Sequence, residues 1–246
     1  MSAPRLFVEE SAAELAAGRE FALPAAAAHH AANALRLRAG ERVTLFTGAG
    51  GELAATIVRI DRRGVTVHVD AFVDVEREAT LRTTLVQAIA ASDAMEYAIR
   101  KAVELGVSAV QPVTTARSAP LPAGPRVTQR HQRWRHIAIA ACEQCGRNRL
   151  PDLRTALPLD EWLRARDATA TGIVLAPDAA RPLPQLSPQA SLDILIGPEG
   201  GFTADEIAGA TRAGIIPVRL GPRVLRTETA GPAALAAAHA LWGDFR

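Results

Sequence analysis

The chain has almost no lysine. Its 246 residues carry 28 basic side chains, and Lys101 is the only lysine among them. Positive charge is therefore carried by arginine, whose planar, bidentate fork suits phosphate groups and base edges better than an ammonium does. A GC-rich genome that favours arginine codons is the alternative explanation. The net charge is only +2, so charge alone is weak support for a polyanionic partner.

Cysteine is also scarce, since Cys142 and Cys145 are the only two. Their C-x-x-C spacing matches a redox pair or half of a zinc site, but no second C-x-x-C completes such a site. We predict reduced cysteines on adjacent turns of a helix and no metal. This cysteine usage fits the cytoplasm. The sequence shows neither a secretory leader nor an apolar run of membrane-spanning length, so we expect a cytoplasmic protein without a membrane partner.

Two common nucleotide-binding signatures are missing, namely G-x-G-x-x-G and a glycine-rich loop that ends in Gly-Lys-Ser/Thr. Two other glycine-rich segments are present instead, at residues 196–202 and 220–231. Each follows a short apolar run and leads into a helix-like stretch, which is typical of ligand-binding loops at the carboxyl ends of parallel strands.

Polar side chains are concentrated in these two segments, and they are Glu199, Arg226, Thr227, Glu228 and Thr229. Four adjacent polar residues are not readily buried without partners, which favours a functional site. The alternatives are a simple turn with a solvated Glu199, a surface ion pair between Arg226 and Glu228, and Thr229 acting as a cap of the last helix.

The first part of the chain has a β-rich pattern. Val65, Val67 and Val69 alternate with polar residues, the period of a half-buried strand. Tight glycine turns between short strands favour a small barrel. We predict strands over 6–8, 42–46, 53–60 and 65–69 and a helix over 24–35. The charged stretch 74–78 is interpreted as a linker, which divides the chain into domains 1–73 and 74–246.

The second part alternates strands with helices, which predicts an α/β domain with a parallel sheet. Thr203 and Glu206 form the T-x-x-E capping box of one helix. Pro232 is placed in the first turn of the last helix. We predict strands over 81–90, 107–113, 172–176, 192–196 and 217–220, and helices over 92–105, 128–145, from 203 onward, and 232–242.

Several segments together resemble the RsmE family, the small-subunit rRNA uridine-N3 methyltransferases of the SPOUT superfamily. The resemblance runs nearly end to end, and segments 196–202 and 220–230 are its most specific part. The other matching residues are Arg5-Leu6-Phe7, Lys101 to Val107, Arg117-Ser118, Glu143 to Arg147 and Pro151.

The resemblance implies a PUA-like RNA-binding β-barrel domain followed by a SPOUT-type α/β methyltransferase domain with a C-terminal trefoil knot. It implies an enzyme of the 16S rRNA (uracil(1498)-N3)-methyltransferase type that uses S-adenosyl-L-methionine and acts as a homodimer on assembled 30S subunits. The implied cofactor contacts are Leu175, Ala176, Pro177, Gly197, Pro198, Glu199, Gly200, Gly201, Leu220, Gly221, Leu225, Arg226, Thr227, Thr229 and Ala230.

Methylation at a protonated ring nitrogen needs a base and a donor that stabilises charge on the flanking oxygens. Arg226 is the expected donor, with Lys101 and Arg147 as rivals, and Glu228 and Glu199 are both candidates for the base. The expected RNA contacts are Arg5, Phe7, Arg36, Arg38, Lys101, Arg117 and Arg147. We expect the dimer to use helix 232–242, through Leu235, Leu241 and Trp242, and the alternative is that this helix packs against its own sheet.

Two alternatives remain at this point. One is a non-catalytic RNA-binding protein with the same fold, against which the intact loops argue. The other is a ribose 2′-O methyltransferase of the same superfamily, which is less favoured because of the PUA-like first half and the Arg226-Thr227-Glu228-Thr229 string.

Overall fold

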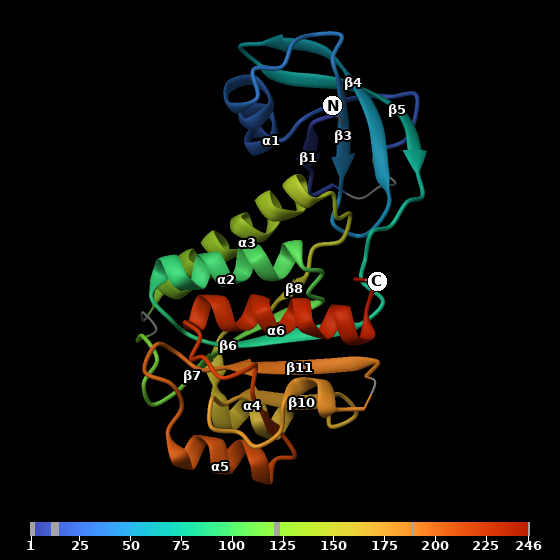
Figure 1. Cartoon of the computed structure of the whole chain (residues 1–246). Coiled ribbons are helices and arrows are strands. Elements are labelled where there is room, and N and C mark those ends of the chain that lie inside the picture. Colours follow the sequence, from blue (N-terminus) through green and yellow to red (C-terminus); the bar gives the residue numbers. More distant parts are fainter. Residues whose placement is uncertain (1–2, 11–14, 121–123, 188, 246) are drawn as a thin grey trace. The chain divides into compact units, whose positions relative to one another are not determined.

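The computed structural model describes residues 3–10, 15–120, 124–187 and 189–245. The chain forms two compact units (Figure 1). The first comprises Met1–Glu78 together with Ile139–Leu150, and the second comprises Ala79–Ala138 together with Pro151–Arg246. Because residues 139–150 return to the first unit, no single boundary in the sequence separates the two. Among the described residues, no helix is long and apolar enough to cross a bilayer.

The first unit contains one sheet with the strand order β1-β3-β4-β5-β2. Its strands are β1 (Arg5–Phe7), β2 (Glu20–Ala22), β3 (Arg42–Phe46), β4 (Glu52–Asp61) and β5 (Gly64–Val73). The helix predicted over 24–35 is α1 (Ala25–His29), which continues as a π-helical turn, η1 (His30–Ala34). Strand β2 was not predicted, because its three residues are too few to show an alternating pattern.

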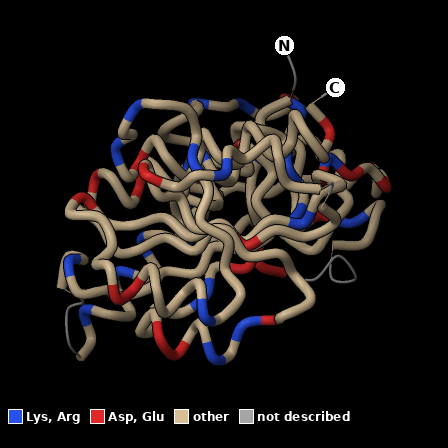
Figure 2. The backbone as a smooth tube through the Cα atoms, turned by 60° about the horizontal axis from the view of Figure 1, so that its bottom comes forward, with Lys and Arg blue, Asp and Glu red and all other residues tan. Residues whose placement is uncertain are grey.

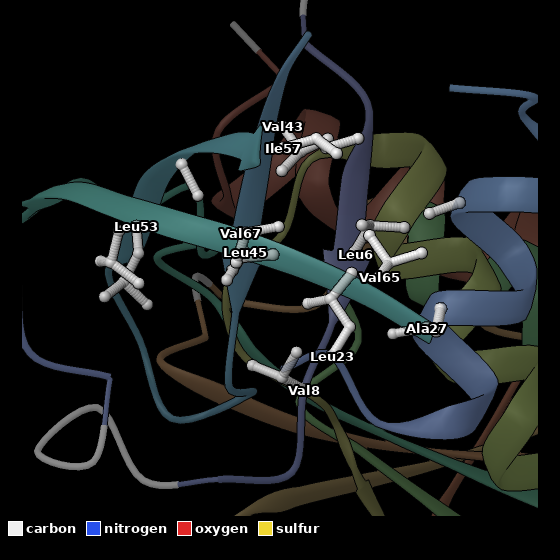
Figure 3. Close-up of a cluster of buried hydrophobic side chains, with 14 of the residues drawn as sticks. Leu6, Val8, Leu23, Ala27, Val43, Leu45, Leu53, Ile57, Val65 and Val67 are labelled. Atoms are coloured by element: carbon white, nitrogen blue, oxygen red, sulfur yellow. The ribbon is translucent and has the colours of Figure 1, made fainter. Parts of the chain in front are cut away.

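The alternating valines of β5 face the core of the first unit, as their spacing predicts. Val65, Val67 and Val69 are buried, whereas Thr66 and His68 between them are only partly buried. Figure 3 shows several of the core side chains gathered between the strands and α1, including Leu6, Leu23, Leu45, Leu53 and Ile57. Burial of this apolar surface is the main source of the unit's stability.

The second unit is built on a parallel sheet with the strand order β12-β10-β11-β6-β7-β8, and β9 also pairs with β7. Each of the recorded strand pairs in this sheet is parallel. Its strands are β6 (Arg82–Ala88), β7 (Ala109–Thr114), β8 (Asp152–Leu153), β9 (Leu157–Pro158), β10 (Thr171–Leu175), β11 (Ser191–Ile196) and β12 (Ile216–Val218). The predicted α/β architecture with a parallel sheet is confirmed.

Helices cover both faces of this sheet (Figure 1). Helices α2 (Ser92–Glu104) and α6 (Thr227–Trp242) pack on one face and against each other. Helices α4 (Leu159–Ala165) and α5 (Ala204–Arg212) lie on the other, where Trp162, Ala210 and the sheet residues Val86 and Val174 share a core. Helix α3 (Pro125–Cys145) begins in the second unit and ends in the first, and η2 (Leu183–Gln185) is a single 3₁₀ turn.

The predicted capping box of α5 is confirmed. The Thr203 hydroxyl accepts a hydrogen bond from the Glu206 backbone N–H at 3.2 Å, and the Glu206 carboxylate accepts one from the Thr203 backbone N–H at 2.8 Å. The two bonds satisfy N–H groups that have no partner within the helix. The start of α5 is thereby fixed directly after the segment 196–202.

Helix α6 begins five residues earlier than predicted. It starts at Thr227 rather than at Pro232, which lies inside the helix. The cap position is Arg226 and carries no side-chain cap hydrogen bond, so the interpretation of Thr229 as the cap was wrong. Pro232 is the sixth residue of α6, where a proline removes the hydrogen bond to the Glu228 carbonyl and its ring also crowds that carbonyl, a cost that the packing of the helix has to offset. The polar string thus forms the first turn of a helix.

The apolar face of α6 is used within the second unit. Ala234, Leu235 and Ala238 are fully buried, and the helix packs against α2, β6 and β11. The prediction that Leu235 offers surface to a second copy was therefore wrong. Leu241 is exposed and Trp242 is half-buried.

Candidate functional site

Three loops at the carboxyl ends of neighbouring strands enclose a cavity of about 570 Å³ in the second unit. They follow β10, β11 and β12, which are adjacent in the parallel sheet. This is the edge of an open α/β sheet at which ligands bind. Its lining residues are Leu175, Ala176, Pro177, Asp178, Ile196, Gly197, Pro198, Glu199, Gly201, Phe202, Ile207, Val218, Arg219, Leu220, Gly221, Arg223, Val224, Leu225, Arg226, Thr227, Glu228 and Ala230.

The residues predicted for this site come together there, with two exceptions. Gly200 and Thr229 do not line the cavity. The Gly200 carbonyl instead accepts a hydrogen bond from Arg117 Nη1 at 2.9 Å. Thr229 lies exposed in the first turn of α6.

Arg226 and Glu228 both line the cavity without partners. Arg226 is exposed and Glu228 is half-buried. Within the described part of the chain, neither side chain forms a hydrogen bond or an ion pair, so the proposed surface pair between them does not exist. A guanidinium and a carboxylate that line one cavity and are not paired with each other are available to a ligand.

Glu199 lines the same cavity, but its carboxylate is engaged. Its Oε1 accepts a hydrogen bond from the backbone N–H of Ala91 at 2.7 Å, directly before α2. The neighbouring Glu206 accepts one from the N–H of Ala116, also at 2.7 Å. Glu199 and Arg117 thus attach the loops after β6 and β7 to segment 196–202, and Glu206 attaches the loop after β7 to α5. Glu199 therefore has a structural role that Glu228 lacks.

A buried relay fixes the first turn of α6 beneath the cavity. The Thr227 hydroxyl donates to the Gly197 carbonyl at 2.6 Å and accepts from Gln87 Nε2 at 2.9 Å. Thr227 and Gln87 are 6% and 1% exposed. The relay joins the ends of β6 and β11 to Thr227, the residue that follows Arg226. It therefore fixes the position of the Arg226 backbone at the cavity.

The loops after β10 and β12 are also bound to each other. Arg219 Nη1 donates to the carbonyls of Ala179 and Ala180, at 2.9 and 2.6 Å. The backbone N–H of Ala176 donates to the Val218 carbonyl at 3.0 Å. The cavity wall is therefore held by hydrogen bonds on each side, which is the preorganisation that a specific binding site requires.

Two of the arginines predicted to contact RNA lie inside the first unit. Arg5 Nη1 forms an ion pair with Glu52 at 2.6 Å, and Arg5 Nη2 donates to Asn148 Oδ1. Arg147 is 4% exposed and pairs with Glu78 at 2.6 Å. Because both guanidinium groups already form ion pairs within the first unit, we reassign them as residues that attach segment 139–150 to the rest of that unit.

The other predicted RNA contacts have more varied positions. Phe7 packs edge-on against Phe46 with ring centroids 5.6 Å apart, so it belongs to the packing of its unit. Its backbone N–H donates to Glu143, whose pKa is raised by burial. Arg36 and Arg38 are exposed. Lys101 pairs with Glu104 at 2.8 Å and does not line the cavity.

The cysteines take no part in the cavity. Both are free thiols, and Cys142 is buried. Burial raises the pKa of Cys142 to about 12, so this thiol is protonated at neutral pH. The described residues contain no cluster of His, Cys, Asp and Glu able to hold a metal.

Sequence reasoning missed several members of the site. Gln87 stands in an apolar strand, where nothing in the pattern distinguishes it from a core residue. Phe202, Arg223 and Val224 lie inside the glycine-rich segments 196–202 and 220–231. Their position in the sequence could therefore have indicated that they line the site. Asp178 and Arg219 lie just outside the predicted loops, and only the structure places them at the cavity.

Comparison with known proteins gives consistent matches. Residues 77–239 match the RNA methyltransferase domain family, and residues 23–70 match the RNA methyltransferase PUA domain family. Ribosomal RNA small subunit methyltransferase E of Mycobacterium bovis is 35% identical over 85% of this chain and 81% of its own. The protein of the same name from Buchnera aphidicola is 28% identical over 99% of this chain and 95% of its own.

Two solved structures match over the full length of both chains. Ribosomal RNA small subunit methyltransferase E of Neisseria gonorrhoeae, bound to S-adenosyl methionine, is 35% identical with a TM-score of 0.92. A Legionella pneumophila protein in complex with the bound cofactor SAM is 34% identical with a TM-score of 0.94. The chain therefore belongs to the RNA methyltransferase family and, within it, to the ribosomal RNA small subunit methyltransferase E group, the RsmE family.

Proposed function

We propose that this protein is an S-adenosylmethionine-dependent methyltransferase that methylates N3 of a uridine, uracil 1498, in 16S rRNA of the assembled 30S subunit. The observation that carries the proposal is the cavity at the ends of β10, β11 and β12, which presents an unpaired Arg226 and Glu228. Membership of the RsmE family supports S-adenosylmethionine as the methyl donor and ribosomal RNA as the methyl acceptor.

The cavity fits the cofactor in size and chemistry. Its volume is within the range of small-molecule sites, roughly 300–1,000 Å³. Apolar walls from Leu175, Ile196 and Leu225 suit a nucleoside, and the charged rim suits an amino-acid group. At Gly201 and Gly221 the backbone has φ of +67° and +72°, and an added Cβ would meet no protein atom within 4 Å. A ligand has room to approach the backbone there.

The cofactor would lie against the three loops, and the residues that would hold it are Leu175 to Pro177, Gly197 to Glu199, Gly201, Leu220, Gly221, Leu225 to Thr227 and Ala230. When bound, S-adenosylmethionine supplies an electrophilic methyl group. The target base must leave its stack to reach this cavity. Uridine N3 must also lose its proton as the new nitrogen–carbon bond forms, which spreads negative charge onto O2 and O4. A donor placed beside those oxygens lowers the barrier.

Arg226 is the donor in this mechanism and Glu228 the base. Arg226 is exposed, lines the cavity and has no partner among the described residues. Glu228 lines the cavity and is half-buried, whereas Glu199 accepts a hydrogen bond from Ala91. We therefore favour Glu228 over Glu199 for proton removal. Lys101 is a poor rival because Glu104 already engages it.

The proposal includes three finer features of assembly. The first unit forms a PUA-like barrel that contributes RNA affinity, supported by its five-stranded sheet and the family match over residues 23–70. The C-terminal segment forms a trefoil knot, supported by its return from edge strand β12 to α2, β6 and β11. The enzyme works as a homodimer, and a species of only 26.0 kDa in light scattering would refute this.

Calorimetric titration of S-adenosylmethionine tests the cofactor site. Gly221→Val places a side chain in left-handed backbone at the cavity, so it should abolish binding, while Gly18→Val, also at positive φ but in the first unit, should not. Equal binding by all three proteins would place the cofactor elsewhere. Methylation of the ribose 2′-hydroxyl of purified small subunits would instead support the alternative reaction.

A further inference from the structure

One long segment of the chain, most of which belongs to the second unit, carries no negative charge. Residues 105–142 contain no aspartate or glutamate, although the 26 acidic residues of this 246-residue chain would place about four in a segment of that length. Figure 2 shows the two signs of charge interspersed along much of the backbone. The segment is thus a local exception, and five arginines lie within it: Arg117, Arg126, Arg130, Arg133 and Arg135.

Three of these arginines lie on one flank of α3. Arg126, Arg130 and Arg133 are spaced i, i+4 and i+7, which brings their side chains together along the helix. Trp134 and Ala138 are buried and mark the side of α3 that faces the core. Arg126 is exposed, and the Arg133 side chain is 65% exposed. Solvent reaches the flank, while the packed side fixes the helix.

The contacts of these arginines are weak or absent. Arg126 has no partner among the described residues. Arg130 Nη1 donates to the Pro120 carbonyl at 3.4 Å, the long end of the hydrogen-bond range. Arg133 pairs with Glu96 at 2.6 Å through Nε alone, and the Arg133 side chain is 65% exposed whereas that of Glu96 is 16% exposed, so the outer end of the guanidinium is open to solvent. An incoming phosphate can therefore compete for all three guanidinium groups.

The same segment reaches the rim of the cavity. Arg117 donates to the Gly200 carbonyl, and the N–H of Ala119 donates to the Ile89 carbonyl at 2.8 Å. The contact between Arg130 and Pro120 shows that the start of α3 lies beside this loop. A connected set of contacts leads from segment 196–202 to the arginine flank. A polyanion bound on the flank would therefore lie on a helix whose start adjoins a loop that is hydrogen-bonded to segment 196–202.

We propose that Arg126, Arg130 and Arg133 form a phosphate-binding surface for the RNA substrate on the methyltransferase unit itself. Arginine forks bind phosphate oxygens bidentately, and such contacts position RNA without reading its sequence. The inference rests on the proposed function for the identity of the polyanion. It places substrate affinity in the second unit, in addition to the contribution proposed for the first.

The test compares the Arg126→Gln/Arg130→Gln/Arg133→Gln variant with wild type. The matched control, Arg154→Gln/Arg164→Gln/Arg212→Gln, removes the same charge from exposed positions on other elements of the second unit. Affinity for protein-free 16S rRNA and for purified small subunits is measured as a function of salt. Each lost phosphate contact lowers the slope of log K against log salt by roughly 0.7–0.9.

For the α3 variant, we expect the magnitude of the slope of log K against log salt to fall by about 2. At physiological salt this variant should bind both RNA substrates at least tenfold more weakly than wild type. The control variant should bind like wild type, and S-adenosylmethionine affinity should be unchanged in both. An α3 variant with the wild-type slope overturns the inference. A loss seen with subunits but not with protein-free rRNA also overturns it, in favour of a ribosomal protein contact. A wild-type protein that binds no cofactor overturns the proposed function instead.

Discussion

Removing the Thr227 hydroxyl tests whether the buried relay fixes the start of α6. In Thr227→Val, the Gly197 carbonyl loses its donor and Gln87 Nε2 loses an acceptor. Gln87 keeps its second bond, to the Ala88 carbonyl at 3.0 Å, and the half-buried Gly197 is accessible to water. The loss is therefore near that of one buried group left unsatisfied, about 1–3 kcal/mol of unfolding free energy.

Tryptophan fluorescence in urea measures this loss in the right part of the molecule. All three tryptophans, Trp134, Trp162 and Trp242, belong to the second unit, so their signal follows the unfolding of that unit. Thr227→Ser keeps the hydroxyl and is the control. We expect the urea midpoint of Thr227→Val to fall with little change in m, and that of Thr227→Ser to fall much less.

A double-mutant cycle separates the hydrogen bond from general packing. Combining Gln87→Leu with Thr227→Val should show a coupling energy of about 0.5–3 kcal/mol, because the two residues are direct partners. Methyl transfer should fall in Thr227→Val, since Arg226 precedes the residue that has lost its anchor. A change of less than about 0.5 kcal/mol in Thr227→Val, with additive effects in the cycle, would refute the relay.

Three further outcomes are expected. Arg226→Ala should slow single-turnover methyl transfer by roughly 10²–10³ with cofactor affinity little changed, and Arg226→Lys should restore only part of the rate; a near-wild-type rate removes Arg226 from the mechanism. Gly221→Val should cost about 1–3 kcal/mol in strain, read from the melting curve. Burial raises the pKa of Glu52, but the hydrogen bonds and charges of Arg5 and Arg77 outweigh burial and lower it overall. Glu52 therefore stabilises the first unit above its unfolded pKa of about 4.5, and this stability is lost as pH falls through the folded pKa. Glu52→Gln should cost about 1–3 kcal/mol at pH 7. By circular dichroism, its difference from wild type should shrink at pH 3, and a constant difference would contradict this.

Much of the fold could be predicted from the sequence because interactions between residues close together in the chain determine it. The alternation of Val65, Val67 and Val69 gives both a strand and its buried face. Thr203 and Glu206 gave the start of α5 through a cap that depends on four consecutive residues. The loops after β11 and β12 were predictable for the same reason, since glycine, proline and clustered polar residues restrict them locally.

What the sequence did not show depends on contacts between distant residues. Arg5 and Asn148 are 143 positions apart, and nothing near either residue indicates that they meet. The bond between Gln87 and Thr227 spans 140 positions. Helix α6 was placed five residues late because Pro232 looked like a first-turn proline, while tertiary packing extends the helix before it. Local pattern therefore identified the loops, and the partners that hold them needed the structure.

The most direct test of the central claim is mass mapping of modified nucleosides in 16S rRNA from a strain that lacks this protein. The account predicts that N3-methyluridine alone disappears from one position. Wild-type protein with S-adenosylmethionine should restore it on purified small subunits, and the Arg226→Ala variant should not restore it at a comparable rate. Unchanged N3-methyluridine in the deletion strain, or the loss of a ribose methyl group instead, would contradict the account.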